Sequence, residues 1–141
     1  MDVLVERAIP ADAAAVARIM FDPDNDPQWI GGARSVERLT PGPIGVGSRV
    51  RRHGGFLGSR FSWVTEVTGF EPDRRLDMVF MEGPMEGGVC YLIQPAPDGA
   101  RVAIHNRGRS KVPLPGMGWM VKRSVAADLK RLAALVERSA M

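Results

Sequence analysis

The acidic segment that begins at Asp22 has the residue types of a metal-binding loop. Its three aspartates occupy alternate positions, as do the first oxygen ligands of a calcium loop. A calcium loop also needs glycine at its sixth position and glutamate at its twelfth, and here those positions hold Pro27 and Ala33. The segment is therefore predicted to be an irregular turn that delivers Trp29 to the interior, and no metal site is expected.

Side chains that could exchange protons near neutral pH are scarce. The chain contains one tyrosine and two histidines. An acid or base that activates a carbonyl or enol would have to come from Tyr91, Glu66, His53 or Arg123. These residues form no recognised catalytic motif, and the shortage of titratable groups favours binding over catalysis.

The sequence contains no cofactor motif. Gly45 and Gly47 begin a pattern typical of dinucleotide binding, but Val50 stands where the third glycine belongs, and strand-like residues follow it. Cys90 is the only cysteine, which excludes an internal disulfide and a cysteine-rich metal site. It lies between apolar neighbours and is predicted to be a small buried residue. No cofactor is expected.

The charge distribution does not favour a nucleic-acid partner. The formal net charge is +3, and arginine supplies sixteen of the nineteen basic residues. Two basic clusters stand out: Arg49, Arg51 and Arg52 with His53, and Arg107 and Arg109 with Lys111. Neither has the interleaved aromatic residues of a single-strand binder or a helix-turn-helix pattern. Both clusters are predicted to lie on solvated outer faces of strands.

Length and hydropathy predict one globular domain over residues 1–141. Hydrophobic residues make up 45% of the chain and charged residues 25%, which is ordinary for a domain with its own core. No apolar run approaches the length of a membrane span, and no basic-then-apolar leader is present. We therefore expect a cytoplasmic protein without membrane insertion, either a monomer or a homodimer.

One long helix is predicted at the end of the chain, over residues 115–141. Its apolar stripe recurs every three or four positions and consists of Val121, Val125, Leu129, Leu132 and Val136. A single amphipathic helix of this length needs a sheet that buries its stripe.

Alternation and turn signals predict strands through most of the remaining chain. The predicted strands are 2–9, 33–39, 48–53, 59–70, 76–82, 89–94 and 101–107. A short helix with an apolar face from Ala13 to Met20 is expected after the first strand. Asp98 and Gly99 are a hairpin signal, and regular strand spacing with such turns implies an antiparallel sheet.

Alternation also assigns faces to the strands. The residues predicted to face inward are Trp63, Thr65, Val67, Met78, Phe80, Val102, Ile104 and Asn106. His105 and Glu66 fall on the opposite, outward face. A register slip of one residue would turn Glu66 inward, where it could act as an acid or base.

Six short stretches occur along the chain in a characteristic order. They are Ile9-Pro-Ala-Asp-Ala-Ala-Ala-Val16, Asp22-Pro with Trp29 a few residues on, Gly42-Pro-Ile-Gly-Val-Gly47-Ser-Arg49, Val67-Thr-Gly-Phe-Glu-Pro-Asp-Arg-Arg-Leu76, Asp98-Gly-Ala-Arg-Val102 and Asp128-Leu-Lys-Arg-Leu132. They cover almost the whole chain, and together they resemble the START-like superfamily, also called SRPBCC. Within it they resemble the bacterial group of polyketide cyclases/dehydrases and lipid-transport proteins.

The resemblance implies an α+β helix-grip fold, as in Bet v 1-like proteins. A curved antiparallel sheet of about seven strands would wrap round the long C-terminal helix, with two short helices after the first strand and a cavity between sheet and helix. Catalytic residues differ between branches of the superfamily, so the resemblance assigns no mechanism. The iron site of its ring-hydroxylating branch would need clustered histidines with a carboxylate, and only His53 and His105 are present.

The expected cavity lining combines large apolar side chains with a few polar groups. Three tryptophans, Trp119 among them, lie in separate elements that this fold would bring together, and Arg123 could help to orient a ligand. The ligand-binding candidates are Trp29, Phe56, Trp63, Met78, Phe80, Tyr91, Ile93, Ile104, Asn106, Met117, Met120, Val121 and Ser124. Large apolar residues on inward faces are equally expected in a plain core.

Three functions are compatible with these features. The leading hypothesis is binding of a small, mostly apolar molecule, such as a lipid, polyketide or aromatic metabolite, between sheet and helix. The alternative is a polyketide cyclase/dehydratase-type enzyme that uses the same cavity, with Tyr91, Glu66 or His53 as its acid or base. A third hypothesis is a protein-interaction domain that uses the basic strands.

Overall fold

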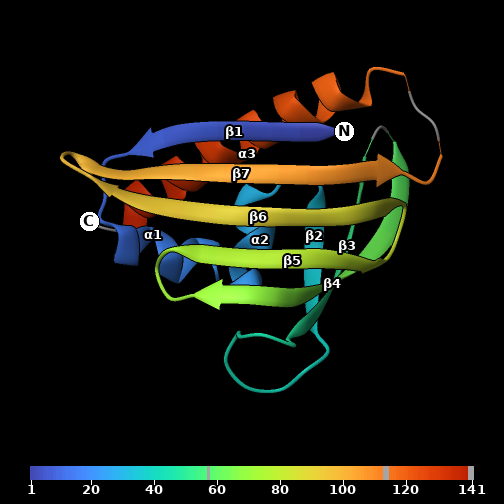
Figure 1. Ribbon diagram of the computed structural model, residues 1–141, viewed down its shortest axis with the longest axis horizontal. Helices are drawn as coiled ribbons and strands as arrows, with labels where there is room; N and C mark the ends of the chain where they lie inside the picture. The colour runs from blue at the N-terminus through green and yellow to red at the C-terminus, as the bar shows by residue number, and fades with distance from the viewer. Residues whose placement is uncertain (57, 113–114, 140–141) are drawn as a thin grey trace.

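The computed structural model describes residues 1–56, 58–112 and 115–139, arranged as in Figure 1. Its elements are β1 (Asp2–Ile9), α1 (Ala13–Met20), the 3-10 helix η1 (Pro23–Asn25), α2 (Asp26–Trp29), β2 (Ala33–Arg38), β3 (Arg49–Phe56), β4 (Ser59–Glu71), β5 (Arg75–Glu82), β6 (Met85–Ala96), β7 (Gly99–Ser110) and α3 (Met117–Ser139). The last two residues of the predicted terminal helix lie outside the described residues.

Seven strands form one antiparallel sheet in the order β1-β7-β6-β5-β4-β3-β2. From β2 onward each strand pairs with the next in the chain, and β1 completes the far edge by pairing with β7. In Figure 1 the sheet bends so that β2 and β3 pass behind β5 and β6, and α3 lies with the short helices on the same, concave side. The predicted α+β helix-grip fold is confirmed.

The predicted apolar stripe holds α3 against the sheet. Val125, Leu129, Leu132 and Val136 are each no more than 9% exposed, and they belong to the main hydrophobic core. The buried residues of α3 begin at Val125, so the first two turns of the helix contribute none. The C-terminal part of α3 therefore packs tightly, whereas its N-terminal part does not.

Some strands are longer than predicted because glycines that resemble turn residues lie inside the sheet. Gly54 is in β3 and Gly87 is in β6, where turns were expected. A Cβ atom on Gly54 would lie 1.7 Å from the carbonyl oxygen of Gly32. The close approach of Gly32, the residue before β2, to β3 is what requires glycine at this position.

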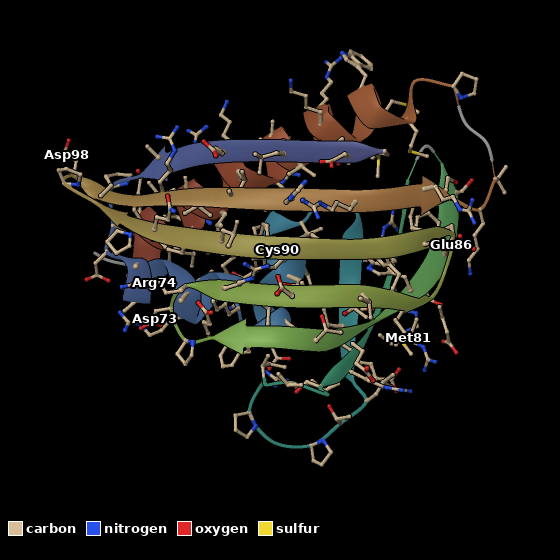
Figure 2. All side chains as sticks on the ribbon, in the orientation of Figure 1. Asp73, Arg74, Met81, Glu86, Cys90 and Asp98 are labelled. Atoms are coloured by element: carbon tan, nitrogen blue, oxygen red, sulfur yellow. The ribbon has the colours of Figure 1, made fainter. Side chains whose placement is uncertain are left out.

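The two basic clusters lie on solvated surface, as predicted, except for Arg52, which is buried. Arg49 pairs with Glu66 at 2.8 Å and Arg109 pairs with Glu86 at 2.8 Å. Figure 2 places Glu86 at one end of the sheet and Cys90 near the middle of β6. Cys90 is half-buried, less than predicted, and burial raises the pKa of its thiol to about 12. The thiol therefore stays protonated and unreactive at neutral pH.

Candidate ligand-binding site

An open space of about 650 Å³ lies between the sheet and the N-terminal part of α3. Its walls include Phe61, Trp63 and Phe80 from the sheet, and Val121 and Ser124 from the helix. We call this space the outer hollow. Its volume lies within the range of about 300–1,000 Å³ that is usual for small-molecule sites.

A smaller space of about 130 Å³, the inner pocket, adjoins the outer hollow. The two share four lining residues, Trp63, Phe80, Asn106 and Val125. The lining of the inner pocket is mostly apolar and includes Trp29 and Tyr91. It also contains three polar or charged side chains that the outer hollow lacks, Arg52, Thr65 and Asp128. The combined space is therefore largely apolar, with its charged groups confined to the inner pocket.

Strand register explains why these side chains converge. Directly paired residues on neighbouring strands project to the same face of a sheet. Arg52 pairs with Trp63, and Thr65 pairs with Phe80. On the other side of the site Tyr91 pairs with Ile104, and Val89 pairs with Asn106. The concave face therefore collects these residues into one lining.

The structure brings together most of the residues proposed from sequence. The inner pocket, the outer hollow or both are lined by Trp29, Trp63, Met78, Phe80, Tyr91, Ile104, Asn106, Met117, Val121 and Ser124. Ile93 is 1% exposed and belongs to the core, and Met120 is half-buried without lining either space. The side chain of Phe56 lies outside what the structure describes.

Two of the proposed acid–base residues lie on the wrong face of the sheet. Glu66 forms its ion pair with Arg49 on the outer surface, as its polarity indicated. His53 is also on the outer surface, with 49% of its side chain exposed, 3.9 Å from Glu37. Neither can reach the outer hollow or the inner pocket, so Tyr91 and Arg123 are left from that set.

Trp119 and Arg123 also point away from the site, contrary to prediction. Trp119 is 65% exposed, and the Arg123 guanidinium lies 5.5 Å from the centre of its ring. Each stands two positions from Val121, which lines the outer hollow. Because two residues correspond to about 200° around a helix, both side chains project from the opposite side of α3.

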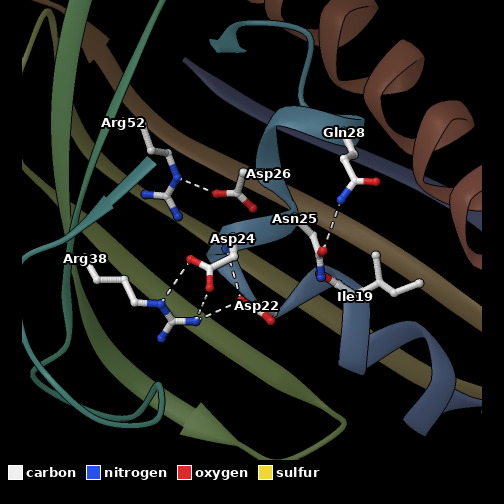
Figure 3. Close-up of polar contacts among 8 residues, drawn as sticks. All are labelled: Ile19, Asp22, Asp24, Asn25, Asp26, Gln28, Arg38 and Arg52. Atoms are coloured by element: carbon white, nitrogen blue, oxygen red, sulfur yellow. Dashed lines mark hydrogen bonds and ion pairs between the residues drawn. The ribbon is translucent and has the colours of Figure 1, made fainter. Parts of the chain in front are cut away.

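The structure reveals a buried ion pair that was not predicted from the sequence. Arg52 is 5% exposed and Asp26 is 1% exposed, although Arg52 was predicted to lie on a solvated face. Arg52 Nε donates to Asp26 Oδ2 at 2.6 Å, and Arg52 Nη1 donates to Thr65 Oγ1 at 2.7 Å. Figure 3 shows this pair beside the exposed contacts of Arg38. Alternation with the buried Val50 was the signal that could have placed Arg52 inside.

Burial is the largest cause of the pKa shifts in this region. Burial raises the pKa of Asp26 to about 6, although the charge and hydrogen bond of Arg52 act in the opposite direction. Burial, and then the negative charge of Asp26, raise the pKa of the Tyr91 hydroxyl. Burial also raises the pKa of Asp128. Tyr91 is consequently a neutral phenol throughout the physiological range and can donate a hydrogen bond.

The raised pKa of Asp26 predicts that this residue destabilises the fold as pH rises from about 4 to about 6. The folded-state pKa of about 6 exceeds the ordinary value of 3.8, so the folded state holds the proton more tightly. The stabilisation by this proton is complete below the ordinary pKa and is lost through pH 6. At about 1.4 kcal/mol per pKa unit, the loss is up to about 3 kcal/mol.

Urea unfolding of the wild type and Asp26→Asn between pH 4 and 7.5 checks this prediction, because asparagine cannot titrate. The stability of the wild type relative to the variant should fall across that window. A difference that is independent of pH would contradict it.

Contacts from α3 hold Trp29 in place. Asp128 Oδ1 accepts a hydrogen bond from the Gly31 backbone N–H at 3.0 Å and also contacts Arg131. Arg131 Nε donates to the Trp29 carbonyl oxygen at 3.0 Å. The Trp29 ring meets the Tyr91 ring edge-on, with centroids 5.8 Å apart. The segment predicted to be irregular is helical, but it does deliver Trp29 to the interior, where the residue is 1% exposed.

Neither a metal site nor a membrane-spanning helix is found in the described residues. No group of three histidine, cysteine, aspartate or glutamate side chains in the described ranges could hold a metal ion. Among the helices of this same part of the chain, none is long and apolar enough to cross a membrane.

The sheet, its gripped helix and the space between them define a helix-grip protein, as in the START-like, or SRPBCC, superfamily. Residues 1–137 match the family described as "Polyketide cyclase / dehydrase and lipid transport", and the chain belongs to this family. No curated protein matches the chain.

Several solved structures have a similar fold. The protein TTHA0849 from Thermus thermophilus is 21% identical, with both chains fully covered and a TM-score of 0.86. The Zhui aromatase/cyclase from Streptomyces sp. R1128 is 16% identical over 100% of this chain and 96% of its own, with a TM-score of 0.84. Ara h 8.0201 is 18% identical over 98% of each chain, with a TM-score of 0.73. At these identities the likeness concerns the fold.

Proposed function

We propose that this protein binds a small, mostly apolar molecule, such as a lipid, polyketide or aromatic metabolite, between the sheet and α3. The observation that carries the proposal is the outer hollow of about 650 Å³ beside a tightly packed core. Its aromatic and aliphatic walls would bury apolar ligand surface, which contributes about 25 cal/mol per Å². The family description, which includes lipid transport, supports the same class of ligand.

Filling part of the outer hollow should weaken binding. The neutral fluorescent probe N-phenyl-1-naphthylamine is expected to bind the wild type saturably, with enhanced emission. Ser124 lines the outer hollow, so Ser124→Trp should fill part of the space and weaken binding by about tenfold or more. Titration of the probe's own emission measures both affinities.

Ala126→Trp provides a matched control, because Ala126 is exposed on the same helix. It should bind the probe as the wild type does. Absence of saturable binding to the wild type, or equal affinities for wild type and Ser124→Trp, would overturn the proposal.

A cyclase/dehydratase activity in the same space is the second candidate. The neutral phenol of Tyr91 lines the inner pocket beside the buried Arg52, where it could donate a hydrogen bond to a substrate carbonyl. The family description and the aromatase/cyclase among the similar structures support this alternative. Product formation from a poly-β-ketone chain that depends on Tyr91 would distinguish catalysis from binding alone.

A further inference from the structure

An open depression of about 450 Å³ lies on the strands β2, β3 and β4, at one edge of the sheet. Its lining consists of Arg34, Ser35, His53, Gly54, Arg60, Phe61 and Ser62. We call it the basic depression, because it collects two arginines and a histidine, and none of its described lining residues is acidic.

Strand pairing explains why these side chains meet. Ser35 of β2 pairs with His53 of β3, and His53 pairs with Ser62 of β4, so their side chains form one row across the outer face. Arg60 stands two residues before Ser62 and projects to the same face. The register of β2 shifts just before Ser35, which makes Arg34 the extra residue of a β-bulge beside this row.

The protein does not neutralise the positive charge of the basic depression. Three other arginines on β2 and β3 are each paired with a carboxylate, namely Arg38, Arg49 and Arg51. Arg34 and Arg60 are exposed, and within the described ranges neither forms an ion pair. The two guanidinium groups are therefore available to an anion from outside.

The remaining polar groups of the basic depression are available as well. His53 Nε2 lies 3.9 Å from Glu37 Oε1, which is beyond hydrogen-bond distance, and Glu37 also lies 3.6 Å from Arg51. Among the described residues the side chains of Ser35, His53 and Ser62 find no hydrogen-bond partner. Guanidinium groups bind phosphate oxygens in a forked geometry, and hydroxyl and imidazole groups add single donors. The set suits a compact anion with several acceptor oxygens.

We propose that the basic depression binds the phosphate group of a small phosphomonoester, with Arg34 and Arg60 as its main ligands. Such a group carries a charge of about −1.5 to −2 at neutral pH and has three acceptor oxygens. Phe61 lines both the basic depression and the outer hollow, and in the depression it would contact the apolar part attached to the phosphate. This site is independent of the proposed binding function, because its polar groups lie on the opposite face of the sheet.

Phenyl phosphate and methyl phenyl phosphate test the proposal, because they share a ring but the diester has a single negative charge. Isothermal titration calorimetry at neutral pH and low salt should show saturable binding of phenyl phosphate, with a Kd of about 1 mM or below. The diester should bind at least about fivefold more weakly, since it offers less charge and fewer acceptor oxygens.

Arg34→Gln and Arg60→Gln should each weaken the binding of phenyl phosphate by about tenfold, through loss of charge-assisted hydrogen bonds. Arg18→Gln is the matched control, because it removes the same charge from an exposed position on α1 that does not line the depression. Its affinity for phenyl phosphate should equal that of the wild type.

A nuclear magnetic resonance measurement on the wild type keeps the test independent of variant folding. The chain has two histidines, so His105→Gln assigns the imidazole signals of both. Phenyl phosphate should shift the His53 signals. It should leave those of His105, which is bonded to Asp2 elsewhere on the sheet, in place.

Three outcomes would overturn the proposal. The first is an absence of saturable binding of phenyl phosphate up to about 10 mM, with unmoved His53 signals. The second is equal or tighter binding of the diester, which would exclude a phosphomonoester and favour the phosphodiester of a nucleic acid or lipid. The third is an equal loss of affinity in Arg18→Gln, which would assign the binding to the overall charge of the protein. None of these outcomes affects the proposed binding of apolar molecules, which the naphthylamine probe tests separately.

Discussion

Asp26→Ala is expected to lower the free energy of unfolding by about 3–5 kcal/mol at pH 7. The reason is that Arg52 is 5% exposed and would keep its charge in the interior without a counter-charge. The 2.6 Å bond to Asp26 would be lost, and only the bond to Thr65 would remain. Because Arg52 lines the inner pocket, the charged part of that lining depends on the same pair.

Chemical denaturation monitored by circular dichroism measures this effect. Glu66→Ala is the matched control, because it breaks an ion pair of Arg49 that is partly exposed and should cost no more than about 1 kcal/mol. The double variant Asp26→Ala/Arg52→Met should be more stable than Asp26→Ala, since it removes the uncompensated charge. If Asp26→Ala and Glu66→Ala lower the free energy of unfolding equally, the buried ion pair contributes no more to stability than the exposed one, contrary to this prediction.

Gly54→Ala is expected to destabilise the protein by about 3 kcal/mol or more, which is large for the addition of one methyl group. The added Cβ would lie 1.7 Å from the Gly32 carbonyl oxygen and 2.8 Å from its carbonyl carbon. Both are backbone atoms, so neither can move aside as a flexible side chain would. The start of β2 and the preceding Gly32 would have to move away from β3. Gly32 and Gly55 line the outer hollow, so the site would change as well.

Gly45→Ala is the control for Gly54→Ala, because it replaces a glycine without creating a steric clash. A Cβ on Gly45 would meet no atom within 4 Å, and this glycine is not in the left-handed conformation. Its replacement should be neutral or stabilising by up to about 1 kcal/mol, through the unfolded state. Thermal and urea unfolding of both variants test the pair, and a Gly54→Ala protein as stable as Gly45→Ala would contradict the expected clash.

The open space of this protein exists because the two halves of α3 pack differently against the rest of the fold. The residues of α3 from Val125 onward fill the interior with Leu129, Leu132 and Val136, all closely packed. The preceding turns carry Met117, Val121 and Ser124, which border the outer hollow instead. A bent sheet touches one half of the helix closely and stands away from the other half, and this difference leaves room for a ligand.

Local periodicity in the sequence determined the elements and most of their faces. The spacing of three and four predicted the buried stripe of α3, and alternation put Trp63, Phe80 and Asn106 on the concave side. These predictions succeeded because the direction of a side chain within a helix or strand depends on its neighbours in the chain. The resemblance of six ordered motifs then supplied the helix-grip arrangement, which periodicity alone does not specify.

Only the tertiary structure decided which of these residues meet. Asp26 and Arg52 lie in separate elements, and although alternation with Val50 could have placed Arg52 inside, nothing in the sequence indicates which carboxylate it meets there. Trp119 is as apolar as Trp29, yet one is exposed and the other buried, because a rotation of about 200° from Val121 carries it to the solvent side of α3. The curvature of the sheet, the pairing of its strands and the angle at which the helix crosses them are long-range properties, so the site they enclose is not encoded in any one stretch of the chain.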